Sequence, residues 1–108
     1  MYQIWVYVPD SHVAQVKDAL FAAGAGQIGD YDACAWQVQG MGQFRPLAGS
    51  QPFIGKLNEV ETVSEWRVEL VCAAGQIRAA LQAMLAAHPY EEPAYGVVPV
   101  LGLADFPA

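Results

Sequence analysis

The side chains best suited to bind a metal ion lie close together near the carboxyl end of the sequence. His88, Glu91 and Glu92 fall within one short segment, and His12 is available near the amino end. Imidazole and carboxylate groups together suit a divalent cation, so a metal ion is the candidate cofactor, with the side chains at 88, 91 and 92 as its ligands. A proline follows both His88 and Glu92 and favours an extended backbone before it, which makes a rigid connector with local hydrogen bonds the favoured interpretation.

A second group of ionisable residues alternates along the clearest strand pattern of the sequence. Glu65, Arg67 and Glu69 share one face of that strand, because every second residue of a strand points the same way. General acid–base catalysis needs a carboxylate whose pKa is raised, whereas the adjacent Arg67 would lower that pKa. The sequence therefore predicts a salt-bridge network between subunits, and it predicts no catalytic residue.

Two glycine-rich segments match phosphate-binding loops only in part. Residues 24–29 have the letters of a dinucleotide-binding motif, but they follow a predicted helix and precede a strand, so no helix N-terminus would face a phosphate. Residues 49–57 end in Gly-Lys-Leu with a spacing one residue too long for a phosphate loop, and Leu57 stands where a magnesium-binding hydroxyl is needed. Neither segment is expected to bind a nucleotide.

The elements that must position these residues alternate between strand and helix patterns. Apolar residues recur about every 2 positions in a strand and about every 3.6 positions in a helix, and this spacing tells the two apart. Asp10 and Ser11 offer a helix N-cap, and Gly24 is expected to end that helix. Strands are predicted at 2–8, 31–38, 60–72 and 95–101, and helices at 13–23 and 77–88.

This order of elements is that of a split βαββαβ motif. It predicts one α+β domain over residues 1–108, a ferredoxin-like sandwich with a four-stranded antiparallel sheet and two helices on one face. Pro99 cannot donate to a ladder, so the last strand is expected at a sheet edge. The uncovered face would carry Trp5, Tyr7, Glu65, Arg67 and Glu69. Such a mixture of aromatic and charged residues favours burial in an oligomer.

Two segments of the predicted fold are unusually long. The strand at 60–72 would reach about 40 Å at about 3.3 Å per residue, so it should bend, carry a bulge, or extend past its own sheet toward another subunit. The connection from Gly40 to Asn58 exceeds ordinary loop lengths and is expected to be functional or to serve as an assembly arm. The expected ligand-binding residues lie in this connection and after the second helix, and they are Gly40, Gly42, Phe44, Tyr90 and Tyr95.

Composition limits the classes of partner. The 108 residues include 5 Lys and Arg against 11 Asp and Glu, a formal charge of −6, and no basic stripe is present to neutralise the phosphates of a nucleic acid.

No apolar run approaches the roughly 20 residues of a membrane span, and the start shows no leader pattern. The chain is expected in the cytoplasm, with Cys34 and Cys72 as reduced, buried residues.

Two sets of residues resemble known families. The segment from His88 to Pro93 resembles the His-Pro-Tyr-Glu-x-Pro signature that follows the second helix of the CutA divalent-cation tolerance proteins. A wider set resembles the PII-like insert domain of the Nif-three-like family, here expected as a stand-alone protein. That set covers nearly the whole chain and consists of 23–26, 28–29, Tyr31, Cys34, 40–42, 44–46, 49–50, Pro52, Gly55 and 88–95.

The resemblance implies a ferredoxin-like fold that assembles as a homotrimer, with the sheets packed around the axis. It carries over no catalytic metal centre, because the His, Asp and Glu ligands of the Nif-three-like dimetal site lie in flanking segments that this sequence lacks. We therefore expect a trimeric, non-enzymatic binding or regulatory module that takes a small ligand or a divalent cation at subunit boundaries. The alternatives are a metal-dependent hydrolase related to full-length Nif-three-like proteins and a purely structural assembly domain.

Overall fold

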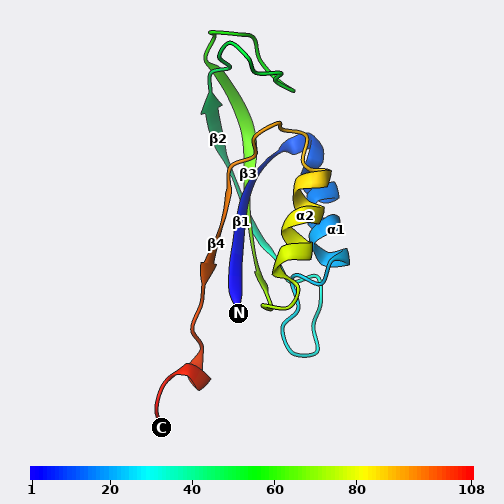
Figure 1. Ribbon diagram of the computed structural model, residues 1–108, viewed down its shortest axis with the longest axis vertical. Helices are drawn as coiled ribbons and strands as arrows, with labels where there is room; N and C mark the ends of the chain where they lie inside the picture. The colour runs from blue at the N-terminus through cyan, green and yellow to red at the C-terminus, as the bar shows by residue number, and fades with distance from the viewer.

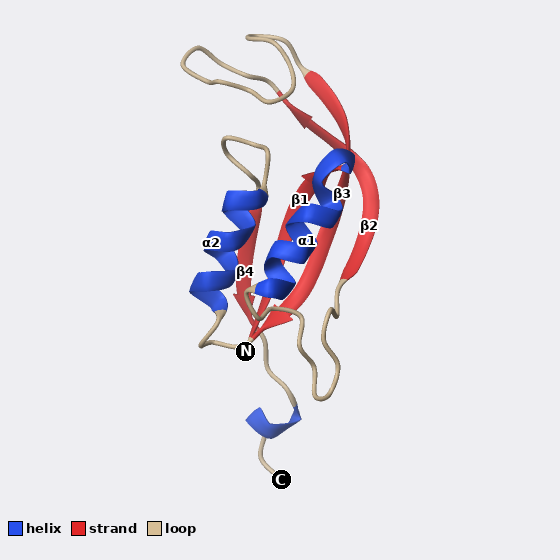
Figure 2. Ribbon diagram, turned by 90° about the vertical axis from the view of Figure 1, so that its right-hand side faces the viewer, coloured by secondary structure: helices blue, strands red, loops and turns tan.

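Four strands form one antiparallel sheet in the order β2-β3-β1-β4 in the computed structural model, which describes all residues 1–108 (Figure 1). Both long helices lie against the same face of the sheet (Figure 2), which confirms the predicted ferredoxin-like fold. Neither helix is long and apolar enough to cross a membrane. In chain order the elements are β1 Tyr2–Pro9, α1 Val13–Ala22, β2 Trp36–Phe44, β3 Glu61–Cys72, α2 Ile77–Ala87 and β4 Tyr95–Pro99.

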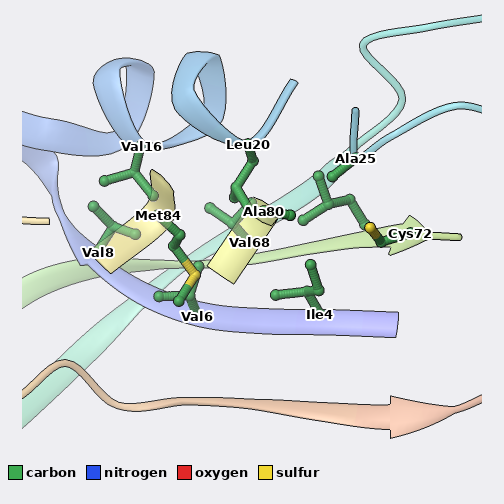
Figure 3. Packing of buried hydrophobic residues seen from close by; sticks show 11 residues of the cluster. Ile4, Val6, Val8, Val16, Leu20, Ala25, Val68, Cys72, Ala80 and Met84 are labelled. Atoms are coloured by element: carbon green, nitrogen blue, oxygen red, sulfur yellow. The ribbon is translucent and has the colours of Figure 1, made fainter. Parts of the chain in front are cut away.

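The core lies between the two helices and the inward face of the central strands (Figure 3). Successive side chains of a strand point to opposite faces, so alternate residues of β1 and β3 are buried where the helices cover them. Truncating a fully buried side chain such as Leu20 to alanine would cost about 2–5 kcal/mol. The fully buried residues of the core include Ile4, Val6, Val8, Val16, Leu20, Val68, Ala80 and Met84.

The second strand begins later and extends further than predicted. The sequence predicts a strand at 31–38, whereas β2 begins at Trp36. Tyr31 forms only an isolated bridge with Ile28, which closes a small turn before the strand. The strand continues through its glycines to Phe44 because β3 offers a full ladder of partners, and this tertiary pairing outweighs the low strand propensity of glycine.

The third strand extends past part of its own sheet. β3 pairs with β2 from Glu61 to Glu69, but it pairs with β1 only from Glu65 onward. The start of β3 and the end of β2 therefore project beyond the rest of the sheet as a two-stranded hairpin (Figure 2), as predicted. The expected contact of this extension with another subunit stays a prediction. The β2–β3 loop accordingly spans 45–60 rather than the predicted 40–58.

Prolines border two other elements as predicted. α2 ends at Ala87, and His88 takes an extended backbone with φ −74° and ψ 136°, as Pro89 requires. The connector, residues 88–94, then leads into β4. This last strand pairs only with β1, so Pro99 lies in an edge strand, where its missing N–H is tolerated.

Two local predictions are wrong. Asp10 and Ser11 make no side-chain cap on α1, because a short 3-10 turn precedes the helix. Asp10 instead accepts a 2.7 Å hydrogen bond from the indole N–H of Trp66 on β3. Cys72 is buried, but Cys34 is only partly buried because it lies in the loop before β2 rather than in a strand.

Candidate ligand-binding site

A cavity of about 810 Å³ lies on the open face of the sheet, where four parts of the chain meet. Its walls come from β2, the β2–β3 loop, the outward residues of β1 and β3, and the connector. Phe44, Phe53 and Tyr90 contribute aromatic rings, and Glu65 and Arg67 contribute opposite charges. The volume falls within the range of about 300–1,000 Å³ that is usual for small-molecule sites.

Four of the five residues predicted to bind a ligand lie in this one wall. Gly40, Gly42 and Phe44 reach it from β2, and Tyr90 reaches it from the connector. Tyr95 is outside the cavity, because β4 begins at this residue and the ladder with β1 holds it along the far edge of the sheet. The structure thus brings together residues far apart in the sequence, and their binding role stays a prediction.

The predicted metal ligands are separated by the fold. Glu91 and Glu92 line the cavity, whereas His88 is 7% exposed and lies outside its wall. The His88 Nε2–H donates to the Tyr7 carbonyl at 2.7 Å, and Nδ1 accepts from the Tyr90 N–H at 3.1 Å. A metal ion would have to displace one of these bonds, and no three His, Cys, Asp or Glu side chains gather to hold one. These residues do not form a metal centre in this conformation, and metal binding stays a prediction.

The His88 ring is held in its neutral form. Because Nδ1 accepts from a backbone N–H, the ring proton must lie on Nε2. Burial lowers the pKa of His88, and this effect outweighs the opposing influence of the hydrogen bond to Tyr7 and of the Glu65 carboxylate. The imidazole therefore acts as an uncharged link between the connector and the end of β1.

Tyr90 joins the connector to β3 across the cavity wall. Its hydroxyl donates to Glu65 Oε2 at 2.8 Å, and its ring lies 6.0 Å from the ring of Phe44. Burial, reinforced by the nearby Glu65 carboxylate, raises the pKa of Tyr90, so the phenol stays protonated as a donor. Gly42 makes room for this arrangement, because a Cβ at that position would overlap the Glu65 carboxylate.

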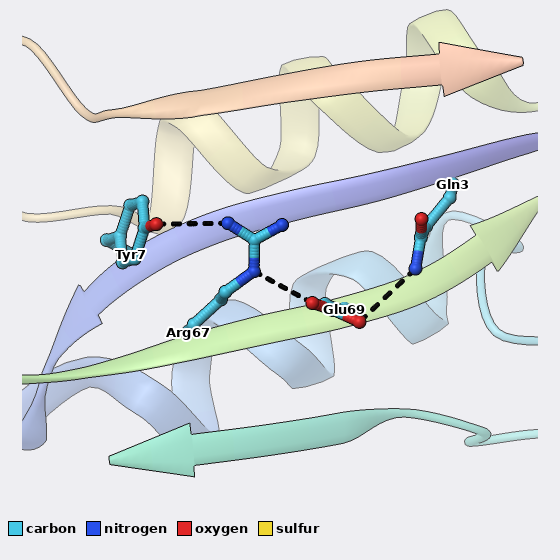
Figure 4. Close-up of polar contacts among 4 residues, drawn as sticks. All are labelled: Gln3, Tyr7, Arg67 and Glu69. Atoms are coloured by element: carbon cyan, nitrogen blue, oxygen red, sulfur yellow. Dashed lines mark hydrogen bonds and ion pairs between the residues drawn. The ribbon is translucent and has the colours of Figure 1, made fainter. Parts of the chain in front are cut away.

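Arg67 is fixed on the open face by two hydrogen bonds (Figure 4) and by a contact with an aromatic ring. Its Nε–H donates to Glu69 Oε1 at 2.8 Å, and its Nη1–H donates to the Tyr7 hydroxyl at 3.0 Å. The guanidinium also lies over the Trp5 ring, 5.0 Å from its centroid. The hydrogen bond to Glu69 and, after it, the one to Tyr7 raise the pKa of Arg67 and keep it charged. Within the chain, Arg67 forms an ion pair only with Glu69, because Glu65 bonds to Tyr90 instead. The network between subunits stays a prediction.

The β2–β3 loop folds back over the cavity. The Gln51 N–H donates to Glu91 Oε2 on the connector at 3.0 Å, which closes the space between the two segments. Phe53 lies edge-on to the His12 ring at 5.5 Å, and so attaches the loop to the turn before α1. Gly55 adopts a φ of +95°, a left-handed conformation that side chains disfavour. Contacts from the connector and from the turn before α1 therefore shape this long loop.

Arg67 and Phe53 are among the wall residues that were not assigned to the site from the sequence. The alternation along β3 placed Arg67 on the open face, but nothing in the sequence showed that a loop would enclose it. Phe53 lies in an irregular segment without any periodic pattern, so no signal marked it as a wall residue. Both depend on how the β2–β3 loop folds back.

Known proteins resemble this chain in both sequence and structure. No family model matches it. A GTP cyclohydrolase 1 type 2 homolog of Mycobacterium leprae is 54% identical over 94 residues, which cover 86% of this chain and 24% of that protein. A Bacillus cereus protein related to NIF3 is 39% identical with a TM-score of 0.78, over 92% of this chain and 25% of its own. CutA from Xylella fastidiosa, 24% identical, aligns with a TM-score of 0.68 over 96% of this chain and 88% of its own, and this likeness shows the fold.

The Nif-three-like relatives are much longer than this chain. The chain spans about a quarter of the length of the curated relatives it matches. The CutA structure, by contrast, is matched over most of its length. This chain is therefore related to one segment of the Nif-three-like (NIF3) proteins, and that segment has the fold of CutA.

Proposed function

We propose that this chain is a small-ligand-binding module of a homotrimer, with its ligand in the cavity between β2, the β2–β3 loop and the connector. The observation that carries the proposal is the combination of apolar rings and fixed charges around one space of about 810 Å³. Small-molecule sites usually have mostly apolar walls with a few polar groups that are held in place before the ligand arrives.

The polar groups in this wall are held by the protein itself. Glu65 is fixed by the Tyr90 hydroxyl, and Arg67 is fixed by Glu69 and Tyr7. Binding a ligand to such groups costs less free energy than binding it to mobile side chains, because the rotamers of the fixed groups are already restricted. This preorganisation supports a binding site over a solvent-filled gap.

The trimer is supported by the surface around the cavity. β2 is an edge strand without a charged residue, and Trp36 and Met41 are 59% and 72% exposed on it. An uncharged, exposed edge strand normally pairs with or is covered by another chain. Together with the implied likeness to trimeric CutA and PII proteins, this feature supports the proposal that the cavity lies near a subunit boundary.

Two measurements test the proposal. Sedimentation equilibrium at micromolar concentration should give the mass of a trimer, and a monomer would contradict the assembly. Two-dimensional NMR of labelled protein with a library of small metabolites should shift the resonances of the cavity wall. A Phe44→Ala variant should weaken any such binding, whereas Phe106→Ala, in the exposed C-terminal segment, should leave it unchanged. Absence of any shift in the wall across the library would contradict the binding function.

A second candidate is enzymatic. The Mycobacterium leprae relative is named a GTP cyclohydrolase 1 type 2 homolog, and a metal-dependent hydrolase activity would follow if this chain shared its chemistry. Purified protein that carries stoichiometric metal and hydrolyses GTP would favour this candidate. Intact trimers that bind no metabolite and no metal would instead favour a purely structural assembly domain.

A further inference from the structure

Resting on the proposed homotrimer, we infer that its subunits join edge to edge, and that the arm of one subunit, residues 100–105, packs against the β2 edge of the next. The strand order is β2-β3-β1-β4 and the arm follows β4, so the contact joins opposite edges of the sheet. The partner of both surfaces is therefore a second copy of this chain. The inference comes from two apolar surfaces at these edges that stay exposed in the single chain.

The arm is an ordered extension of the chain. The Val100 N–H donates to the Met1 carbonyl at 3.1 Å, which continues the β1–β4 ladder past the end of β4. The Asp105 carboxylate accepts from the Gly102 N–H at 2.7 Å, and these bonds precede a 3-10 turn at Leu103–Asp105. Figure 1 shows the arm leading away from the sheet. Because the arm is already ordered, its binding to a partner costs little conformational entropy.

The apolar side chains of the arm are offered to solvent. Leu101 is 71% exposed and Leu103 is 92% exposed. Single exposed apolar residues are ordinary, but these two lie together on a segment that projects from the body and form one apolar patch. The charged residue of the arm, Asp105, bonds to its own backbone. The arm therefore suits an apolar surface that carries no opposite charge.

Backbone groups also point outward at this edge. In an antiparallel ladder, a residue directs its N–H and C=O to the same neighbour, and successive residues alternate. Ala94 and Val100 bond to β1, so the odd-numbered residues between them direct their groups away from β1. Pro99 has no N–H to offer there, which protects β4 from pairing, and Leu101 is the first residue beyond it that does. Pairing with another chain is thus directed to the arm.

The β2 edge offers the matching surface. Its nine residues include no charged residue and no proline, and its register with β3 is continuous, so no bulge turns it aside. Natural edge strands usually carry such features, which prevent pairing with another chain. Trp36 and Val38 stand opposite Glu69 and Arg67 in the ladder, and both are exposed. β2 therefore offers unpaired backbone groups beside an apolar strip.

The net charge of the chain favours contact at these two edges. Each copy carries a formal charge of −6, so two copies repel each other wherever acidic surfaces approach. β2 has no charged side chain, and the single carboxylate of the arm accepts a hydrogen bond from its own turn. Contact between the arm and β2 thus joins the copies where little charge opposes them.

A contact between two different edges can close into a ring. The arm and β2 lie at opposite edges of the sheet, so every subunit uses both, which is a heterologous interface. Two β2 edges that paired with each other would instead form a two-fold dimer and leave the arms uncovered. The proposed trimer therefore favours the contact of arm with β2. Because β2 is one wall of the cavity, the arm of the neighbour would lie beside each cavity.

Cross-linking between two glycines tests the contact. Gly40 on β2 and Gly102 in the arm have no heavy atom within 4 Å of an added Cβ, so cysteine fits at both positions. In a Cys34→Ser background, a short bismaleimide should link the Gly40→Cys/Gly102→Cys protein into covalent dimers and trimers. Each single variant should stay unlinked. Dimers formed by Gly40→Cys alone would show that β2 edges pair with each other, and would overturn the inference.

Charged substitutions in the arm give a second test. Leu101→Asp and Leu103→Asp should each raise the dissociation constant of the trimer about tenfold or more in sedimentation equilibrium, because the contact would bury an unpaired carboxylate. Leu85→Asp, at a residue that is 38% exposed on α2, is the matched control and should keep the trimer. Circular dichroism should show an unchanged fold in both arm variants, since the replaced side chains lie in solvent. Trimers of full affinity in both would contradict the inference.

The trimer and its edge contact fail in different ways. A trimer that is not cross-linked between positions 40 and 102, and that tolerates both arm substitutions, would reject the contact and retain the proposed assembly. A monomer of the unchanged protein at micromolar concentration would reject both.

Discussion

The hydroxyl of Tyr90 donates a 2.8 Å hydrogen bond to the carboxylate of Glu65, and this bond joins the connector to β3. It connects residues 88–94, which belong to the most recognisable motif of the sequence, to β3, the strand with the clearest alternation of residues between its two faces. The same two residues form one wall of the cavity, so the bond links the stability of the connector to the shape of the proposed site.

Removal of the Tyr90 hydroxyl should destabilise the protein without altering its fold. In Tyr90→Phe the half-buried Glu65 carboxylate loses its donor, and the free energy of unfolding should fall by about 1 kcal/mol in urea denaturation. Tyr31→Phe, at a residue that is 75% exposed, serves as the matched control and should change little. Equal stability of Tyr90→Phe and the unchanged protein would mean that the bond contributes nothing in solution.

Two glycines of β2 should respond differently to the same substitution. A Cβ at Gly42 would overlap the Glu65 carboxylate, whereas a Cβ at Gly40 has no heavy atom within 4 Å. Gly42→Ala should therefore lower the free energy of unfolding by about 1–3 kcal/mol through overpacking, and Gly40→Ala should not. Thermal unfolding of the two variants side by side gives the comparison, and similar losses in both would show that Glu65 moves aside freely.

The stability of the protein should depend on pH through His88. Its pKa in the folded state is lowered from 6.5 by burial, whereas the unfolded chain titrates near the ordinary value. Between these two pKa values the unfolded state binds more protons, so the free energy of unfolding should decrease as the pH falls below about 6.5. Above that pH the contribution is complete and constant.

Urea denaturation between about pH 7 and about pH 5 measures this dependence. His88→Gln should lower stability at neutral pH and flatten the slope in that window. A slope that survives in His88→Gln would assign the pH dependence to other groups.

Zinc titration should separate the two interpretations of the connector. Both ring nitrogens of His88 are engaged in hydrogen bonds, so we expect Zn(II) affinity to be the same in the unchanged protein and in His88→Ala. Glu91→Ala should be tested beside it, because the Glu91 carboxylate faces the cavity and is another predicted metal ligand. Stoichiometric zinc binding that is lost in His88→Ala would restore this residue as a metal ligand.

Much of the fold could be predicted because its signals are local. Alternation in β1 and β3, helical spacing in α1 and α2, and the edge position of Pro99 follow from periods and from the chemistry of single residues. β2 was misplaced because Gly40 and Gly42 lower the strand signal, and only the ladder with β3 holds this segment as a strand. Local propensity cannot show a partner strand that lies far along the chain.

The site was only partly predictable for a related reason. Gly40, Gly42, Phe44 and Tyr90 could be named because the long connection and the proline-bordered connector stand out in the sequence. The pairing of Glu65 with Tyr90 rather than with Arg67 depends on where the connector crosses the sheet, and that placement is a tertiary contact. The roles of individual side chains therefore depend on neighbours that no spacing rule reveals.

The most direct test of the central claim is a crystal structure of the assembled protein, grown with a metabolite that shifts the resonances of the cavity wall. The account predicts a trimer with ligand density in each cavity, in contact with Phe44 and Tyr90. A trimer whose cavities are filled by a segment of the neighbouring subunit would contradict it.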